Sequence, residues 1–177
     1  FRNSRTFGVT DPQFGADVGF YVFRLPLISF LSDWLFAALL LIIIITLITH
    51  VLNGAVLFAG MVPTVRQATK VHMAVLLAIL AVLRAGDYWL ARFDLTNETR
   101  GVVQGATYAV VNAELPALML LILIALLTAV LFLVTIRTDR WRFPLIASVL
   151  WLVVSIGGGS VYPSLIQSLV VRPNQAE

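Results

Sequence analysis

The sequence contains no cysteine and few charged residues. Without cysteine, disulfide bonds, thiolate metal sites and thiol catalysis are excluded within these 177 residues. Charged residues make up 12% of the chain, whereas a soluble domain usually carries about 25%. Hydrophobic residues make up 60%, and a small fold cannot remove that much apolar surface from water. The composition therefore predicts a membrane protein whose main partner is the lipid bilayer.

The basic residues do not form a surface for nucleic acid. The formal net charge is +3, but these residues are scattered over the connectors between apolar segments. The sequence shows neither a basic stripe nor interleaved aromatic platforms, which nucleic-acid-binding proteins use. We therefore expect no nucleic-acid partner.

Four segments are long and apolar enough to cross a bilayer, which requires about 20 residues. The predicted spans are about 34–58, 71–90, 115–136 and 143–166, within a transmembrane region of residues 27–166. Continuous apolar length supports them, because a lipid-exposed helix is apolar on all sides. The expected fold is all-α, a polytopic membrane helix bundle with four transmembrane helices.

A short interfacial helix is expected before the first span. Asp11-Pro12 reads as a helix N-cap followed by proline at the first helical position, and apolar residues recur at helical spacing from Phe14 to Leu25. This pattern predicts an amphipathic helix on the membrane surface that ends near Pro26. Residues 1–26 would then face outward, and 167–177 would begin an extracytoplasmic region.

The density of basic residues predicts an orientation. With four spans, the short connectors 59–70 and 137–142 lie on one side, and they carry more basic residues per length than the rest of the chain outside the spans. Cytoplasmic connectors are enriched in lysine and arginine. We therefore expect a multi-pass protein of the plasma membrane with 59–70 and 137–142 in the cytoplasm and both ends of the chain outside. The basic residues of these connectors are Arg66, Lys70, Arg137, Arg140 and Arg142.

Three strings resemble a known family. They are "DPQFGADVGFYVFRLP" (Asp11 to Pro26), "NAELPAL" (Asn112 to Leu118) and "YPSLIQSLVVRPN" (Tyr162 to Asn174). Together they resemble the uncharacterised protein family UPF0182. The resemblance implies a large bacterial membrane protein, in which a membrane region of several helices is followed by a large extracytoplasmic domain. The family supplies no catalytic or ligand-binding residues that can be carried over.

Charged residues near the predicted outer face form a candidate polar cluster of Asp33, Arg84, Asp87 and Glu114. Arg84 and Asp87 are three residues apart, so their side chains meet on one helix face. One interpretation is a local ion pair at a helix end, with Arg84 reaching toward the interface. In the other, all four side chains converge between helices, where charges often mark a pathway or a fixed contact. Glu114 also has a simpler role, because a carboxylate stabilises a helix N-terminus.

Two further features have structural interpretations. The run Gly157, Gly158 and Gly159 allows close helix packing or a kink, and alternatively a substrate site at a broken helix. His50 and His72 lie near the same ends of their spans and lack a third ligand, so we expect hydrogen bonding between helices. No catalytic residues, metal site or cofactor are predicted.

Two functions from different classes remain open. The preferred one is a membrane module that anchors and assembles a large extracytoplasmic domain by packing against other transmembrane helices, either of the same longer chain or of a membrane complex. The alternative is a transport or channel unit with a polar site near the outer face. An enzyme is not expected, because no catalytic group has a convincing partner in the sequence.

Overall fold

The protein is an antiparallel arrangement of helices with two small hairpins. The computed structural model describes residues 6–57, 64–97, 99–100, 103–104, 110–138 and 142–156. The helices are α1 (Leu25–Leu52), α2 (Gln67–Asn97), α3 (Leu115–Thr138) and α4 (Arg142–Ile156). Five-residue π-helical turns, Phe20–Arg24 and Val110–Glu114, lead into α1 and α3. Strand β1 (Val56–Leu57) pairs antiparallel with β2 (Thr64–Val65), and β3 (Thr99–Arg100) pairs antiparallel with β4 (Val103–Gln104).

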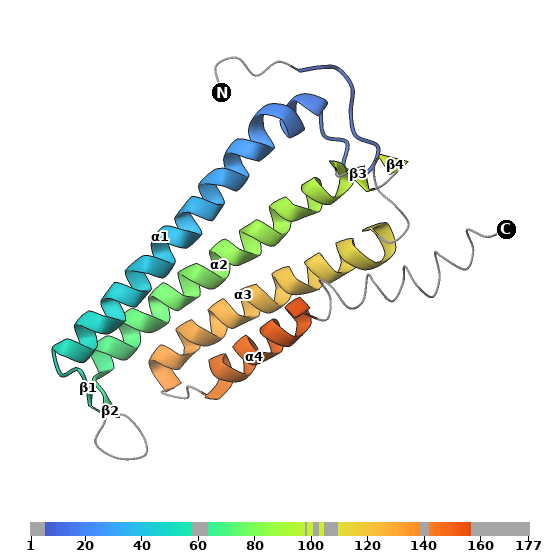
Figure 1. Cartoon of the computed structure of the whole chain (residues 1–177). Coiled ribbons are helices and arrows are strands. Elements are labelled where there is room, and N and C mark those ends of the chain that lie inside the picture. The colour runs from blue at the N-terminus through green and yellow to red at the C-terminus, as the bar shows by residue number, and fades with distance from the viewer. Residues whose placement is uncertain are drawn as a thin grey trace.

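The helices lie side by side in chain order, with α2 and α3 in the middle and α1 at one edge (Figure 1). The start of α1, the end of α2 and the start of α3 share one end of the molecule, which we call the Leu25 end. The opposite end, which we call the Leu52 end, holds β1 and β2. Packing is most extensive between α2 and α3, which makes this pair the centre of the structure.

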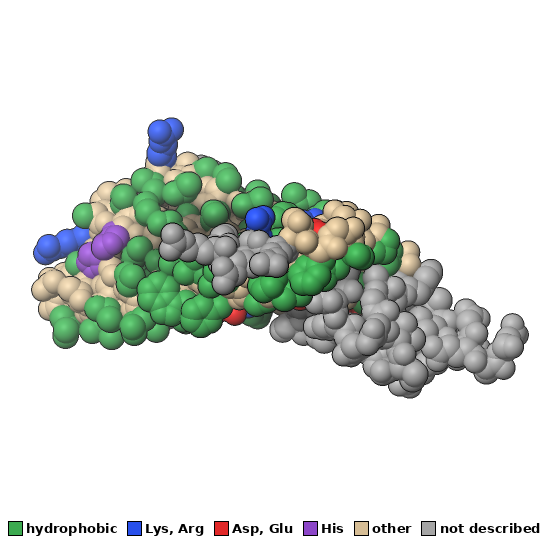
Figure 2. Space-filling view, turned by 90° about the horizontal axis from the view of Figure 1, so that it is seen from above, with side chains coloured by type: hydrophobic (Ala, Val, Ile, Leu, Met, Phe, Trp, Pro, Cys, Tyr) green, Lys and Arg blue, Asp and Glu red, His purple; other side chains and the backbone are tan. Residues whose placement is uncertain are grey.

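Among the residues that the structure describes, three helical segments are long and apolar enough to cross a membrane. They are Phe20–Leu52, Gln67–Leu95 and Val110–Thr138. Hydrophobic side chains accordingly cover much of the surface (Figure 2). In α4 the apolar stretch is Leu145–Val154, and residues 157–166 of the predicted span 143–166 lie outside the described residues. The all-helical fold with several membrane-compatible helices is thus observed, and the fourth span stays a prediction.

The structure does not confirm a separate interfacial helix before Pro26. Asp11 does accept a hydrogen bond from the Phe14 N–H, at 2.8 Å, as an N-cap residue does. Gly15 then adopts a φ of +65°, which turns the chain before a helix forms. Helical structure begins later and continues through Pro26, which lies in the first turn of α1, where its missing N–H costs little.

Instead of a helix, the N-terminal segment forms a loop that covers the end of α2. The rings of Phe14 and Phe20 pack against Phe93, with centroids 4.8 and 5.1 Å from it. Hydrogen bonds from the N–H groups of Phe7 and Gly19 hold the pKa of the Asp17 carboxyl below its usual value. The ionised form of Asp17 therefore supports the loop at neutral pH, and this support is lost as the pH falls through the lowered pKa.

The interface between α2 and α3 is built from small residues. On α2 the buried alanines recur three and four residues apart, so they lie on one helix face. On α3, Ala125 and Ala129 are also buried, and Phe132 packs against two of the α2 alanines. Small side chains let two helix backbones approach closely, which is the usual basis of helix association in membranes. The buried alanines of α2 are Ala74, Ala78, Ala81 and Ala85.

The assignment of 59–70 and 137–142 to the cytoplasm requires correction. Residues 67–70 form the first turn of α2, residues 137–138 close α3, and Arg142 begins α4. These basic residues therefore belong partly to helix ends; Arg137, for example, lies in the last turn of α3, where a cation is stabilised by the helix dipole. The density of basic residues in these ranges is therefore not a property of free connectors, and the cytoplasmic assignment is withdrawn.

The alanine interface generates a testable prediction. Ala81, which is 1% exposed, contacts the α3 side of the interface, so Ala81→Leu should force α2 and α3 apart. We expect the free energy of unfolding to fall by about 1–3 kcal/mol, the usual cost of overpacking. Thermal unfolding of the full-length protein in detergent measures this. Ala68→Leu is the matched control, because Ala68 is exposed on the same helix. Equal melting temperatures for the two variants would contradict the interface.

Candidate functional site

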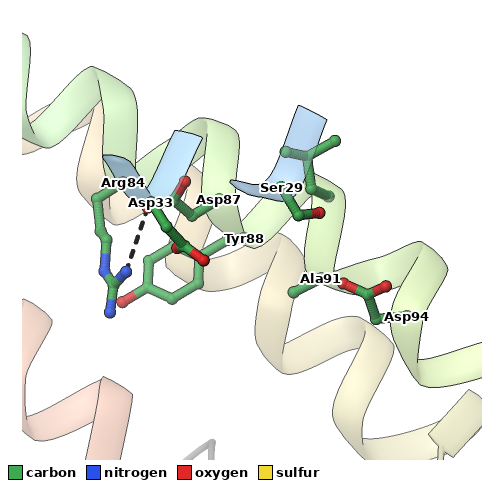
Figure 3. Close-up of a pocket in the computed structure, with 8 residues that line it drawn as sticks. Ser29, Asp33, Arg84, Asp87, Tyr88, Ala91 and Asp94 are labelled. Atoms are coloured by element: carbon green, nitrogen blue, oxygen red, sulfur yellow. Dashed lines mark hydrogen bonds and ion pairs between the residues drawn. The ribbon is translucent and has the colours of Figure 1, made fainter. Parts of the chain in front are cut away.

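A cleft between α1 and α2 near the Leu25 end is the candidate site. Its volume is about 260 Å³. Figure 3 shows Asp33 of α1 beside Arg84 and Asp87 of α2, with Asp94 farther along α2. The cleft thus combines one guanidinium with three carboxylates. The lining residues are Ser29, Asp33, Arg84, Asp87, Tyr88, Leu90, Ala91 and Asp94.

Helical spacing explains how the sequence builds this cleft. Arg84, Asp87, Ala91 and Asp94 are three or four residues apart, so they lie on one face of α2. Ser29 and Asp33 are four residues apart on α1 and form the opposite wall, and the nearby Ser32 bonds to Asp87. Each wall is therefore a single face of a continuous helix, and the packing of α1 against α2 brings the two together.

Arg84 and Asp87 form the central ion pair of the cleft. The Arg84 Nη1 atom lies 3.2 Å from Asp87 Oδ2. The second carboxylate oxygen of Asp87 accepts a hydrogen bond from the Ser32 hydroxyl, which joins α2 to α1. The Asp87 side chain is 12% exposed, whereas that of Arg84 is 39% exposed. The carboxylate is thus held between two donors, and the guanidinium reaches toward the surroundings.

Aromatic rings hold the guanidinium in position. The Arg84 Cζ atom lies 4.9 Å from the centroid of the Phe36 ring and 5.6 Å from that of Tyr88. Such cation–π contacts stabilise a partly desolvated cation. The Tyr88 hydroxyl in turn accepts a hydrogen bond from Trp151 Nε1, at 3.1 Å. Through Tyr88, the cleft is connected to α4 on the other side of α2.

The structure brings together three of the four residues of the predicted cluster. Asp33, Arg84 and Asp87 line the same cleft. Glu114 does not line it; it is half-buried where the π-helical turn joins α3. The run Gly157, Gly158 and Gly159 lies outside the described residues. Whether the cluster has a function stays a prediction.

Sequence reasoning missed four polar residues of this region. Ser29, Tyr88 and Asp94 line the cleft, and Ser32 bonds to Asp87. The three- and four-residue spacing from Arg84 to Asp94 is visible in the sequence and indicates one helix face. This pattern could have identified Asp94. The two serines carried no such signal, because their contact with α2 depends on how α1 rotates against it.

A second polar group lies at the Leu52 end. The Thr69 hydroxyl lies 3.1 Å from His50 Nδ1, and His50 Nε2 lies 3.3 Å from His72 Nδ1. This chain of hydrogen bonds joins α1 to α2, as expected for these histidines. Among the described residues, no group of three His, Cys, Asp or Glu side chains is placed to hold a metal ion.

The ion pair generates a second prediction. Asp87→Asn should leave the Arg84 guanidinium without its anion and should lower the free energy of unfolding by about 1 kcal/mol. The double variant Arg84→Gln/Asp87→Asn should be more stable than Asp87→Asn alone, because it removes both charges. Thermal unfolding of the full-length protein in detergent provides the measurement, with the exposed Arg66→Gln as control. A silent Asp87→Asn variant would show that the pair is not coupled.

Comparison with known proteins identifies the family but not a structural relative. A family model described as "Uncharacterised protein family (UPF0182)" matches residues 1–177. Similar curated proteins, each named a UPF0182 protein, occur in Frankia alni (40% identity over 174 residues), Rhodococcus erythropolis (37% over 179) and Thermobifida fusca (38% over 175). The alignments cover 98%, 100% and 99% of this chain, but 17%, 18% and 17% of the relatives. No solved structure matches. The family match over the whole chain confirms the resemblance of its strings: the chain belongs to the uncharacterised protein family UPF0182.

Proposed function

We propose that this region is a membrane module of the plasma membrane that anchors and assembles a large extracytoplasmic domain. The chain spans 17–18% of the length of its curated relatives, so most of a full-length relative lies outside the region. Three segments of the region are long and apolar enough to cross a bilayer. The proposed role is structural rather than enzymatic, and the lipid bilayer is the proposed environment of these helices.

The observation that carries this proposal is the distribution of polar side chains along the described helices. The histidines lie at the Leu52 end, whereas the charged residues of the cleft lie between the middle of α2 and the Leu25 end. Between these two polar groups, α2 is apolar from Met73 to Leu83. In α3 the Thr128 hydroxyl donates to the backbone carbonyl of Ile124, at 2.7 Å, within its own helix. The Thr128 hydroxyl is therefore satisfied within its own helix, and the apolar stretch of α2 separates the cleft from the histidines, which suits a packed scaffold better than a pore.

A transport unit is the second candidate, and the charged cleft is the observation that favours it. A cavity of about 260 Å³ with charges of both signs suits a small polar solute. Transport also requires a path to the opposite face. The apolar stretch of α2 from Met73 to Leu83 interrupts such a path within the described part of the chain, so anchoring is the better-supported function.

The third prediction tests anchoring in the full-length protein. A site for a specific protease, inserted after Asn174, allows the region to be separated from the portion that follows it. Cleavage of isolated membranes should release that portion into the soluble fraction, because its attachment depends on the membrane-spanning helices. An uncleavable insertion of the same length is the control. If the released portion stays with the membranes after a high-salt wash, anchoring by this region is wrong.

The same material separates the two candidate functions. Proteoliposomes of the uncleaved protein should show no faster equilibration of small ions and solutes than empty liposomes. A flux that Arg84→Gln abolishes would overturn the scaffold role and support transport through the cleft.

A further inference from the structure

Helix α1 carries an exposed stripe beside the face that packs against α2, and Asp33 lies at the edge of this stripe that also borders the cleft. The residues of the stripe are three or four positions apart, so they form one continuous face of the helix. All of them are exposed, whereas Ile43, on another face of α1, is 7% exposed. Only 6% of the most apolar window of α1 is buried, against 28% for α2 and 33% for α3. The α1 stripe consists of Phe30, Asp33, Ala37, Leu41, Ile44 and Ile48.

Asp33 is the one charged residue of the α1 stripe, and its charge is not balanced within the described part of the chain. It is exposed, and no hydrogen bond or ion pair joins it to another described residue. The neighbouring guanidinium of Arg84 is engaged by Asp87. The cleft wall that Asp33 shares therefore keeps an excess of negative charge.

Contact with lipid alone is favourable for the apolar residues of the α1 stripe, but it leaves the charge of Asp33 unbalanced. Acyl chains cover Leu41, Ile44 and Ile48 at no cost, whereas a carboxylate within a membrane-compatible segment, as Asp33 is, is stabilised by a cationic partner. Ala37 follows Asp33 by one turn, and its small side chain permits close approach of another helix backbone. The three- and four-residue spacing is that of helix-packing surfaces. These features fit a helix with a basic side chain.

We propose that the α1 stripe docks a transmembrane helix from the part of the longer protein that lies N-terminal to this region, and that this helix presents a lysine or arginine to Asp33. More than four fifths of the length of these relatives lies outside this region, which leaves room for such a segment, and the charge of Asp33 selects a basic one. This inference rests on the proposed assembly function and names the surface and the chemistry of the partner. The docked helix completes the packing of α1, whose most extensive contact among the described elements is with α2.

The fourth prediction tests this contact by photo-crosslinking in membranes that contain the full-length protein. A photoreactive phenylalanine analogue replaces Ala37 on the α1 stripe, and in a separate control it replaces Ile43. Illumination at position 37 should link α1 to a peptide N-terminal to residues 1–177, within an apolar segment that contains a lysine or arginine. Position 43 should give links within residues 1–177. Links from position 37 to lipid alone, to a second copy, or only to residues 1–177 and the portion that follows them would overturn the proposal.

Charge exchange at Asp33 tests the chemistry of the contact. In the background with the analogue at position 37, Asp33→Lys should abolish the link to the outside peptide, whereas Asp33→Glu should retain it. Replacing the linked basic residue by aspartate should restore the link in the Asp33→Lys background. An undiminished link in Asp33→Lys would show that charge does not select the partner. Membrane anchoring, measured by protease release, is a separate readout, so failure of the docking contact is distinguishable from failure of the proposed function.

Discussion

The close packing of α2 against α3 is the contact on which the rest of the structure depends. Buried alanines on α2 meet small and aromatic residues on α3, and α2 is thereby fixed in rotation. Because one face of α2 packs against α3, the face that carries Arg84 and Asp87 turns toward α1 and lines the cleft. In a bilayer, where apolar surface gains little by leaving lipid, such close contact is the main source of helix association.

Polar interactions add specificity at the two ends of this packed core. At the Leu25 end, Ser32 of α1 donates to Asp87 of α2, and the N-terminal loop packs its aromatic rings on Phe93. At the Leu52 end, His50 and His72 connect the same two helices. Because unpaired polar groups are costly in hydrocarbon, these bonds define the register of α1 against α2. The cleft and the α1 stripe follow from that register, since both depend on which side of α1 faces α2.

Local patterns predicted some features well and failed where two signals competed. Asp11 does cap a turn, as its sequence position suggests, but the positive φ of Gly15 ends that turn before a helix develops. Pro26 looked like a helix end and lies instead inside the first turn of α1, where proline is equally acceptable. Basic residues assigned to connectors belong partly to helix ends. In each case the sequence correctly indicated the local conformation that the residue favours. The position of the residue within a turn or helix, however, depended on its neighbours in the chain.

The sequence by itself predicted helices that are long and apolar enough to cross a membrane, the helical class, the family and the local pairing of Arg84 with Asp87. These depend on apolar length, on distinctive strings and on a three-residue spacing, all of which are properties of short stretches of chain. Only the tertiary structure decided that Asp33 joins this pair, that Glu114 does not line the cleft and that Ser32 completes the carboxylate's hydrogen bonds. It also decided which face of α1 remains exposed. These depend on the rotation and depth of one helix against another, and helices that are apolar all round carry little periodic signal to predict either.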